Sequence, residues 1–308
     1  MASNQTTDKK VTNEASTQTE TKRFSFSRLF NRNGHEKKTL PAAEPKGPPK
    51  SVWREYFESG VVTVVMALFG MTFIVQAVKV PTGSMQNTIT IGDHLLVNKF
   101  IFAPGKSLPF LPQRDIRRGD IIVFKYPGNK YDPSKDQGSD NRPIFTNYVK
   151  RVIGLPGDRI TVKGQDVIVN GEVIPEHRIL AKDHDKLPRD RFTKANERNA
   201  PLEIITSPPR KPNEKYDVYF TPDADHQGIV FDNDDQIVVP ADSYFVMGDN
   251  RDNSEDSRFW GYVPRDLVIG RAMFVYWSYD ESAPPTDYGF LVDFFVNTRW
   301  SRTGTLVK

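Results

Sequence analysis

The chain has 308 residues, with 42 Lys and Arg against 39 Asp and Glu, and it has no cysteine. The absence of cysteine excludes thiol nucleophiles, cysteine-ligated zinc and disulfides. A net charge of +3 is too small to indicate a nucleic-acid partner.

Residues 1–59 are predicted to form a disordered cytoplasmic tail. The first 50 residues are rich in Ser, Thr, Asn and Lys, so they bury too little apolar surface to offset the conformational entropy lost on folding. Residues 1–59 hold 11 Lys and Arg against seven Asp and Glu. By the positive-inside rule, this basic flank stays in the cytoplasm.

A charge-free apolar run at 61–78 follows the tail and ends at Lys79. Eighteen residues at a rise of ~1.5 Å span about 27 Å, close to the hydrocarbon thickness of a bilayer. A cleaved secretory signal would be shorter and would begin near the N-terminus, and a buried helix is the other alternative. The run predicts a single transmembrane anchor at 60–79, which puts residues 80–308 on the outer side of the membrane.

Residues 80–308 are predicted to form a mainly β domain. Short β-branched or aromatic runs are separated by Gly, Pro and Asn, a pattern typical of antiparallel strands. An Asn-Gly pair at 170–171 lies between two apolar stretches, which is the strongest short hairpin signal. The predicted strands lie at 121–124, 148–153, 159–162, 167–169, 237–239, 244–247 and 268–277.

Two polar, proline-containing insertions interrupt this pattern at about 127–143 and 175–235. Both are predicted to be surface elaborations rather than catalytic parts, because long insertions in loops cost little stability. One strand is predicted within the second insertion, at 216–220.

A serine and a lysine are the candidate catalytic pair. Pro-Thr-Gly-Ser-Met at 81–85 directly follows the apolar run, and Lys150 lies 66 positions after Ser84 in an apolar strand. A serine hydroxyl is a weak nucleophile that needs a positioned base. At a pKa of ~10.4 only roughly one lysine in 2,500 is neutral at pH 7, but burial among apolar groups lowers that pKa. The pair suggests a Ser/Lys hydrolase at the membrane surface, and a solvated strand lysine is the alternative.

A third segment, 248–264, combines turn-forming, charged and aromatic residues in one loop after a strand. Its Asp-x-Asn-x-Asp character also occurs in calcium loops. Here, however, Trp260 stands at the twelfth loop position, where an EF-hand has glutamate, and Arg251 occupies a ligand position. Calcium binding is therefore not expected.

Taken together, these segments resemble those of type I signal peptidases, the bacterial leader peptidases. The resemblance implies an antiparallel two-sheet β fold after a single transmembrane helix. It also implies a serine endopeptidase, a hydrolase that removes N-terminal signal peptides from exported preproteins. Self-cleaving repressors resemble the same core but carry a DNA-binding module, and an inactive membrane-anchored scaffold is the other alternative. The matching segments follow the family's order at 81–85, 92–99, 118–124, 148–158, 248–264 and 270–272.

The resemblance assigns a role to each polar residue of the candidate site. It makes Ser84 the nucleophile and Lys150 the general base. Ser254 matches the serine that hydrogen-bonds and orients the lysine amine. The backbone N–H of Ser84 and the hydroxyl of Thr82 match the oxyanion donors; many family members have serine where Thr82 stands, and either hydroxyl can donate.

Three further positions are assigned by resemblance alone. Asp256 and Arg258 match a structural ion pair beside the site and are not expected to be catalytic. Asn87 stands where the family usually has proline, so it is expected to loosen the turn after Ser84.

Substrate selection is expected to follow from small apolar clefts. In the family these accept alanine-sized side chains at the first and third residues before the cut, the Ala-x-Ala pattern, and reject larger ones by clash. Plain core packing is the alternative for each lining position, above all for Ile89. The matching positions are Val80, Pro81, Met85, Ile89, Tyr148 and Val149.

The lysine base also indicates a compartment, because bacterial and organellar members use lysine and the endoplasmic reticulum enzymes use histidine. The resemblance therefore implies a single-pass protein of the bacterial inner (cytoplasmic) membrane, with a cytoplasmic N-terminus and a catalytic domain on the periplasmic or outer side. The implied partners are signal peptides of preproteins, the lipid bilayer and the protein-export machinery, with no nucleic acid. No cofactor or metal is expected, and the cluster Asp183-His184-Asp185 is expected to be solvated.

Overall fold

The computed structural model describes residues 51–103, 113–130, 133–136, 147–183, 200–222, 236–283 and 288–308. Residues 1–50 of the tail predicted at 1–59 and part of both insertions lie outside the described residues. The described end of that tail is helical from Val52, which corrects the prediction of disorder there. The chain divides into two units, Met1–Glu55 and Tyr56–Lys308, and the strands all belong to the second.

The apolar run lies in a helix. Helix α1, Val52–Phe69, continues as a π-helical turn, η2, at Gly70–Ile74, and none of its side chains is buried. Among the described residues, Val52–Ile74 is the one helix long and apolar enough to cross a membrane, with a mean hydropathy of 1.8 in an 18-residue window. An apolar helix is therefore present where the sequence predicts an anchor.

The bounds of this helix differ from the prediction. The helix ends at Ile74, and residues of the apolar run after it form strand β1, Val75–Lys79. The reason is a partner strand, because β1 pairs antiparallel with β2, Asp93–Asn98, and Val78 is buried against the core. The helix therefore begins and ends earlier in the sequence than the predicted anchor at 60–79.

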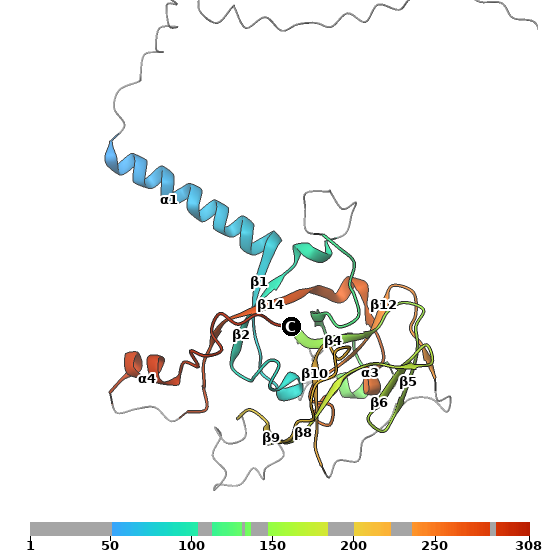
Figure 1. Ribbon diagram of the computed structural model, residues 1–308. Coiled ribbons are helices and arrows are strands. Elements are labelled where there is room, and N and C mark those ends of the chain that lie inside the picture. Colours follow the sequence, from blue (N-terminus) through green and yellow to red (C-terminus); the bar gives the residue numbers. More distant parts are fainter. Residues whose placement is uncertain are drawn as a thin grey trace, which may run out of the picture. The chain divides into compact units, whose positions relative to one another are not determined.

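The largest sheet among the described residues has seven antiparallel strands and carries Lys150; several of its strands are labelled in Figure 1. It is built from runs rich in Val, Ile and Phe, residue types that favour strands. Lys150 lies on β4, an inner strand between β3 and β12, so its side chain is surrounded by the sheet and its packing partners. In sheet order the strands are β1, β2, β14 at Val268–Ser278, β3 at Ile121–Lys125, β4 at Asn147–Gly154, β12 at Ser243–Met247 and β13 at Val263–Pro264.

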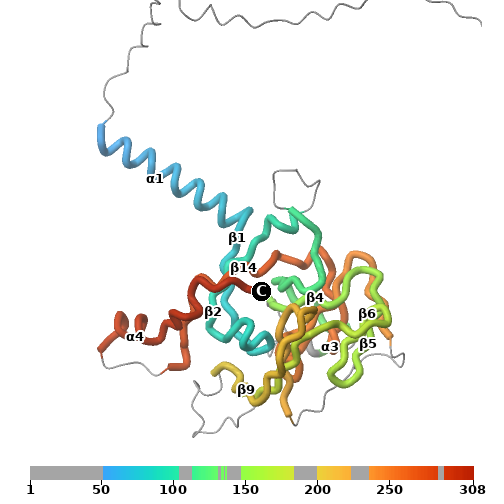
Figure 2. The backbone as a smooth tube through the Cα atoms, in the orientation of Figure 1, coloured from blue at the N-terminus to red at the C-terminus, as the bar shows by residue number. Residues whose placement is uncertain are grey.

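A second, four-stranded antiparallel sheet contains the predicted hairpin. Along the chain β4 leads into β5 and β6, which lie side by side (Figure 2). Asn170 and Gly171 both have positive φ, 54° and 88°, as a two-residue hairpin turn requires. The strands are β11 at Ile237–Val238, β5 at Arg159–Lys163, β6 at Asp166–Val169 and β7 at Glu172–Val173.

The second insertion forms a sheet of its own and enters the core, which corrects the prediction of a surface elaboration. Its strands are β8 at His177–Lys182, β9 at Glu203–Thr206 and β10 at Asp217–Phe220, which confirms the strand predicted at 216–220. Strands β8 and β10 are parallel. Val218 and Phe220 pack with Ile153, Ile160 and Phe245, so the insertion completes the core of the domain.

The mainly β, antiparallel fold is confirmed, with the described strands in three sheets and one parallel pair. Among the described residues, short helices lie between the strands or, for α4, after the last one. They are η3 at Gly83–Met85, η4 at Phe100–Phe102, η5 at Pro133–Asp136, α3 at Ser257–Trp260, η7 at Arg265–Leu267 and α4 at Phe290–Asn297.

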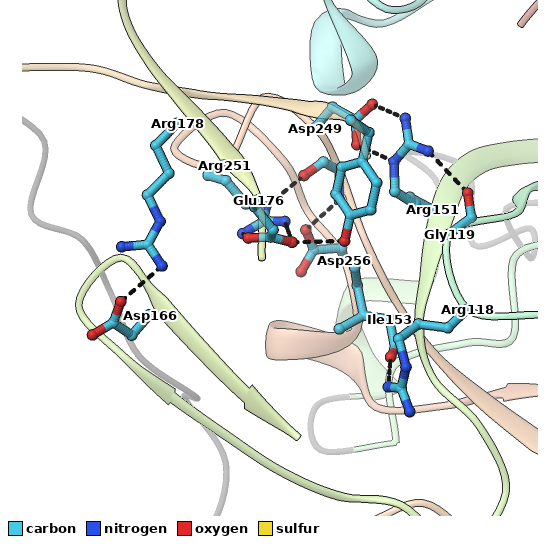
Figure 3. A network of polar contacts seen from close by, with 12 residues as sticks. Arg118, Gly119, Arg151, Ile153, Asp166, Glu176, Arg178, Asp249, Arg251 and Asp256 are labelled. Atoms are coloured by element: carbon cyan, nitrogen blue, oxygen red, sulfur yellow. Dashed lines mark hydrogen bonds and ion pairs between the residues drawn. The ribbon is translucent and has the colours of Figure 1, made fainter. Parts of the chain in front are cut away.

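A buried ion pair ties the insertion to the loop after β12 (Figure 3). Arg251 Nη1 donates to Glu176 Oε2 over 2.7 Å, and the two side chains are 1% and 0% exposed. The Tyr216 hydroxyl also donates to Glu176, over 2.9 Å. Such a pair fixes geometry strongly, because either charge left alone would be buried without compensation.

Glu176→Gln is expected to lower the free energy of unfolding by about 3–5 kcal/mol, since it leaves the Arg251 charge buried and unpaired. Urea unfolding of the detergent-solubilised protein measures this change. Glu172→Gln, on the exposed strand β7, serves as the matched control and is expected to be neutral. Equal stability of the two variants would contradict a fold-defining role for the pair.

Candidate active site

Ser84 lies in a buried turn between strands β1 and β2 of the seven-stranded sheet. The 3₁₀ turn Gly83–Met85 follows Thr82, whose backbone is extended. Met85 and Ile89 anchor the turn because both side chains lie in the core, and the Met85 sulfur accepts a hydrogen bond from the Asp249 N–H over 3.3 Å. Ser84 itself is 8% exposed, so the hydroxyl is held in place but can still be reached.

Lys150 meets Ser84 directly. Its Nζ donates a hydrogen bond to Ser84 Oγ, and its side chain is 1% exposed. The two candidate residues, 66 positions apart in the sequence, are thus in contact. Burial lowers the pKa of Lys150 from its ordinary value of 10.5 to about 8; the neighbouring Asp256 carboxylate opposes this shift and the Arg258 guanidinium adds to it. At such a pKa, a usable fraction of the amine is neutral near physiological pH.

Asp256 and Arg258 form the expected ion pair. Arg258 Nε and Nη2 lie 2.9 Å from the two carboxylate oxygens, and Asp256 also caps helix α3 by accepting from the Arg258 N–H. Burial raises the pKa of Asp256, but the Arg258 guanidinium, together with Lys150 and the Gly248 N–H, outweighs that effect, so the pKa lies below its usual range. The carboxylate therefore stays charged near Lys150.

Ser254 is buried at the site, and its hydroxyl donates to Asp256 Oδ2 over 2.7 Å. Because the hydroxyl hydrogen is used in this bond, the lone pairs of the Ser254 oxygen point away from Asp256. The oxygen is therefore available as an acceptor, which is the property that an orienting partner of the Lys150 amine needs. The bond from Lys150 to Ser254 itself stays a prediction.

The six candidate cleft residues divide by burial. Val80, Met85, Ile89 and Val149 are buried in one core cluster, and Ile89 has no exposed surface. Ile89 is thus a core residue in this structure, which is the alternative given for it in the sequence analysis.

The other two cleft candidates keep accessible surface. Pro81 is exposed. Tyr148 is partly buried, with its ring centroid 5.0 Å from that of Tyr126. Thr82, two residues before the nucleophile, is also exposed.

Three expectations about polar residues are changed or limited by the structure. Asn87 does not loosen the turn after Ser84, because its side chain makes two hydrogen bonds to the backbone of Leu202. Asp183 is buried rather than solvated, since Asn250 Nδ2 donates to its carboxylate over 2.9 Å. His184 lies outside the described residues. Within the described ranges, no three His, Asp or Glu side chains are grouped so that they could hold a metal ion.

Sequence reasoning missed the buried pair of Arg151 and Asp249. Arg151 Nε and Nη2 donate to the Asp249 carboxylate over 2.8 and 2.7 Å, and Nη1 donates to the Gly119 carbonyl (Figure 3). Arg151 follows Lys150 on β4, and neighbouring strand residues point to opposite faces. The one sequence signal for this pair was that Arg151 directly follows Lys150 in a strand. Lys150 then lies on one face of β4, and Arg151, on the other face, holds the loop that begins at Gly248.

A family model described as signal peptidase, peptidase S26, matches residues 53–277. The chain belongs to this signal peptidase family. Its members remove signal peptides from preproteins, and this chain is a serine peptidase of that class. The match includes all but the first residue of helix α1, the Ser84 turn, β4 and the loop after β12, so it covers every residue of the site described above.

Curated relatives agree with this assignment. A signal peptidase I from Leptolyngbya laminosa is 33% identical over 255 residues, which cover 81% of this chain and 95% of the relative. The signal peptidase I of Pseudomonas aeruginosa is 32% identical and covers 78% of each chain. That of Aquifex aeolicus is 30% identical over 78% of this chain and 93% of its own length. An apolar N-terminal helix in a member of this family fits a membrane-anchored enzyme.

Gly248→Ala is expected to disrupt the site. A Cβ at position 248 would clash with the Ser254 hydroxyl and the Ser84 carbonyl, so it would push the Ser84 turn and Ser254 apart. Displacement of a catalytic group by about 1 Å can cost about 100-fold in rate, so kcat should fall by that order. Gly60→Ala, which has no atom within 4 Å of the added methyl, is the matched control. A wild-type kcat in folded Gly248→Ala would contradict this geometry.

Proposed function

We propose that this peptidase is bound to the bacterial inner membrane and cuts exported preproteins after small residues of the Ala-x-Ala type, with Ser84 and Lys150 as its catalytic pair. The observation that carries the proposal is the contact between Lys150 Nζ and Ser84 Oγ in a buried position. A lysine can act as a base there because burial lowers its pKa to about 8.

The geometry supports a two-step acyl transfer. Neutral Lys150 takes the hydroxyl proton as Ser84 Oγ attacks the carbonyl carbon of the scissile bond. The resulting ammonium then gives its proton to the leaving amine, which releases the mature protein and leaves an ester on Ser84. Lys150 next takes a proton from water as the water oxygen attacks the ester. The ammonium then returns that proton to Ser84 Oγ as the C–Oγ bond breaks, which frees the signal peptide and restores neutral Lys150.

The polar neighbours would stabilise the charged states of this cycle. The N–H of Ser84 and the hydroxyl of Thr82 would donate to the oxyanion of the tetrahedral intermediate. The Ser254 oxygen would orient the Lys150 amine, with its own hydrogen fixed on Asp256. Pro81 and Tyr148, the cleft candidates with accessible surface, would contact the substrate first.

The cleavage reaction is the direct test. Purified wild-type protein in detergent should cut a preprotein whose signal ends in Ala-x-Ala, at the bond after the second alanine, as located by mass spectrometry. Ser84→Ala and Lys150→Ala should each abolish the cut, since nucleophile and base act as one unit. Lys150→Arg should also be inactive, because guanidinium does not deprotonate in proteins. Robust turnover by either lysine variant would remove Lys150 from the mechanism.

The pH dependence of cleavage should follow the protonation of Lys150. The neutral amine is the active form, so kcat/KM should rise about tenfold per pH unit below the lysine pKa and level off above about 8. Initial rates between pH 6 and 9.5 at low substrate concentration measure the profile. A flat profile, or one that falls over this range, would be incompatible with a lysine base.

Thr82→Val removes one hydroxyl at nearly constant volume. If that hydroxyl donates to the oxyanion, kcat should fall by ~10²–10³-fold with little change in KM. Thr82→Ser should retain most of the activity. If Thr82 is only a turn residue, Thr82→Val would lower the melting temperature and leave kcat unchanged, so both are measured on the same samples.

The proposed orientation rests on the excess of Lys and Arg in residues 1–59, 11 against seven acidic residues. In spheroplasts, a cysteine introduced at position 20 should be protected from a membrane-impermeant thiol reagent. One introduced at the exposed Asn213 should be labelled. The native chain has no cysteine, so each signal reports one site. The reverse pattern would contradict the outer location of the site.

A further inference from the structure

The turn that carries the nucleophile continues into an unusual residue. Asn87 has a φ of +71°, a left-handed conformation that non-glycine residues seldom adopt and that proline cannot reach. Asparagine tolerates this region better than most residues, at some cost in energy. Such a conformation persists where surrounding contacts hold it.

Those contacts come from the residues just before strand β9, within the second insertion. Asn87 Nδ2 donates to the Leu202 carbonyl over 3.2 Å, and the Leu202 N–H donates to Asn87 Oδ1 over 2.8 Å. Beside them, Gln86 Nε2 donates to the Ala200 carbonyl over 2.7 Å. Gln86 is buried and Leu202 lies in a small core cluster with Tyr219. The C-terminal side of the nucleophile turn is therefore fixed by three hydrogen bonds to the insertion.

The N-terminal side of the turn is tied to the same insertion through Asn250. Asp183, which directly follows β8, accepts from Asn250 Nδ2 over 2.9 Å. The same amide group donates to the Gly83 carbonyl over 3.3 Å, and the Asn250 N–H donates to the Ser84 carbonyl over 3.1 Å. Asp183 and Asn250 are both buried. The two carbonyls that flank the nucleophile are thus held by a residue whose side chain is oriented by the insertion.

We propose that Asn87 and Asp183 are positioning residues for Ser84, through which the second insertion sets the place of the nucleophile against Lys150. The proposal rests on the proposed role of Ser84. Neither residue touches the reacting atoms; each acts through the turn at 83–87. Hydrogen bonds at both ends restrict the turn more than core packing of Met85 alone. Lys150 is fixed in a central strand, so a shift of the turn would change the distance from Ser84 Oγ to the Lys150 amine.

The variants separate side-chain contact from backbone strain. Asn87→Gly keeps the freedom to adopt positive φ and removes both bonds to Leu202. Asp183→Ala removes the acceptor for Asn250, and Asp183→Asn restores an acceptor oxygen of the same reach. Asn213→Ala, an exposed asparagine of the same insertion, is the matched control.

Kinetics of preprotein cleavage provide the first readout. Asn87→Gly and Asp183→Ala should each lower kcat by about 10- to 100-fold with KM within twofold of wild type. Asp183→Asn should recover most of the loss, and Asn213→Ala should match wild type. Losses confined to melting temperature, with kcat unchanged in the folded fraction, would show a merely structural role and overturn the proposal.

Hydrogen exchange provides a readout that does not depend on activity. Amides in a peptide covering 82–90 should exchange at least about tenfold faster in Asn87→Gly and Asp183→Ala, while those of β4 keep their protection. Unchanged exchange at 82–90 in both variants would overturn the proposal. If the wild-type protein does not cut the preprotein, the proposed function fails, and the exchange data still decide whether the insertion fixes the turn.

Discussion

The burial of the Lys150 amine against Ser84 is the interaction on which the rest of the site depends. A fall in its pKa from 10.5 to about 8 corresponds to roughly 3 kcal/mol of destabilisation of the folded state at pH values below 8. The sign follows from proton binding: between pH 8 and 10.5 the unfolded chain holds more protons on this lysine than the folded one does. Stability therefore rises with pH across that window, and the full cost is present at neutral pH. In the proposed mechanism this cost is offset by function, because a solvated lysine could not supply the base.

Buried ion pairs hold the loop that lies beside the Lys150 amine. Three buried carboxylate and guanidinium pairs converge on the loop after β12, namely Asp256 with Arg258, Asp249 with Arg151, and Arg251 with Glu176. Buried pairs add little net stability compared with apolar packing, yet removing one partner is costly. Their effect here is to hold an irregular loop against a regular sheet, which is how many enzymes combine a rigid scaffold with functional loops. The same loop supplies Ser254, which bonds to Asp256, and Asn250, which bonds to the Ser84 carbonyl, so the ion pairs hold the loop that contacts the Ser84 turn.

Local sequence patterns predicted the parts of the fold that depend on local chemistry. The β-branched runs at 121–124 and 244–247 are strands, and the Asn-Gly pair is a hairpin turn. Residues 75–78 were predicted as helix because an apolar run fits either state until a partner strand such as β2 is known. The contact of Ser84 with Lys150 came from family resemblance, since spacing alone left a solvated lysine as an alternative. Contacts between distant segments, such as Asn87 with Leu202 or Glu176 with Arg251, leave no local signal, so the structural part of the second insertion could not be foreseen.

The protonation state of Lys150 in the resting enzyme tests the central claim most directly. Lysine labelled with ¹³C at the ε carbon gives one resonance per side chain, and the signal lost in Lys150→Met assigns the one of interest. Titration of that resonance by NMR in detergent should give a pKa of about 8. A value near the ~10.4 of a solvated lysine would contradict the account, because the amine would then be charged at the pH where the enzyme works and could not take the proton of Ser84.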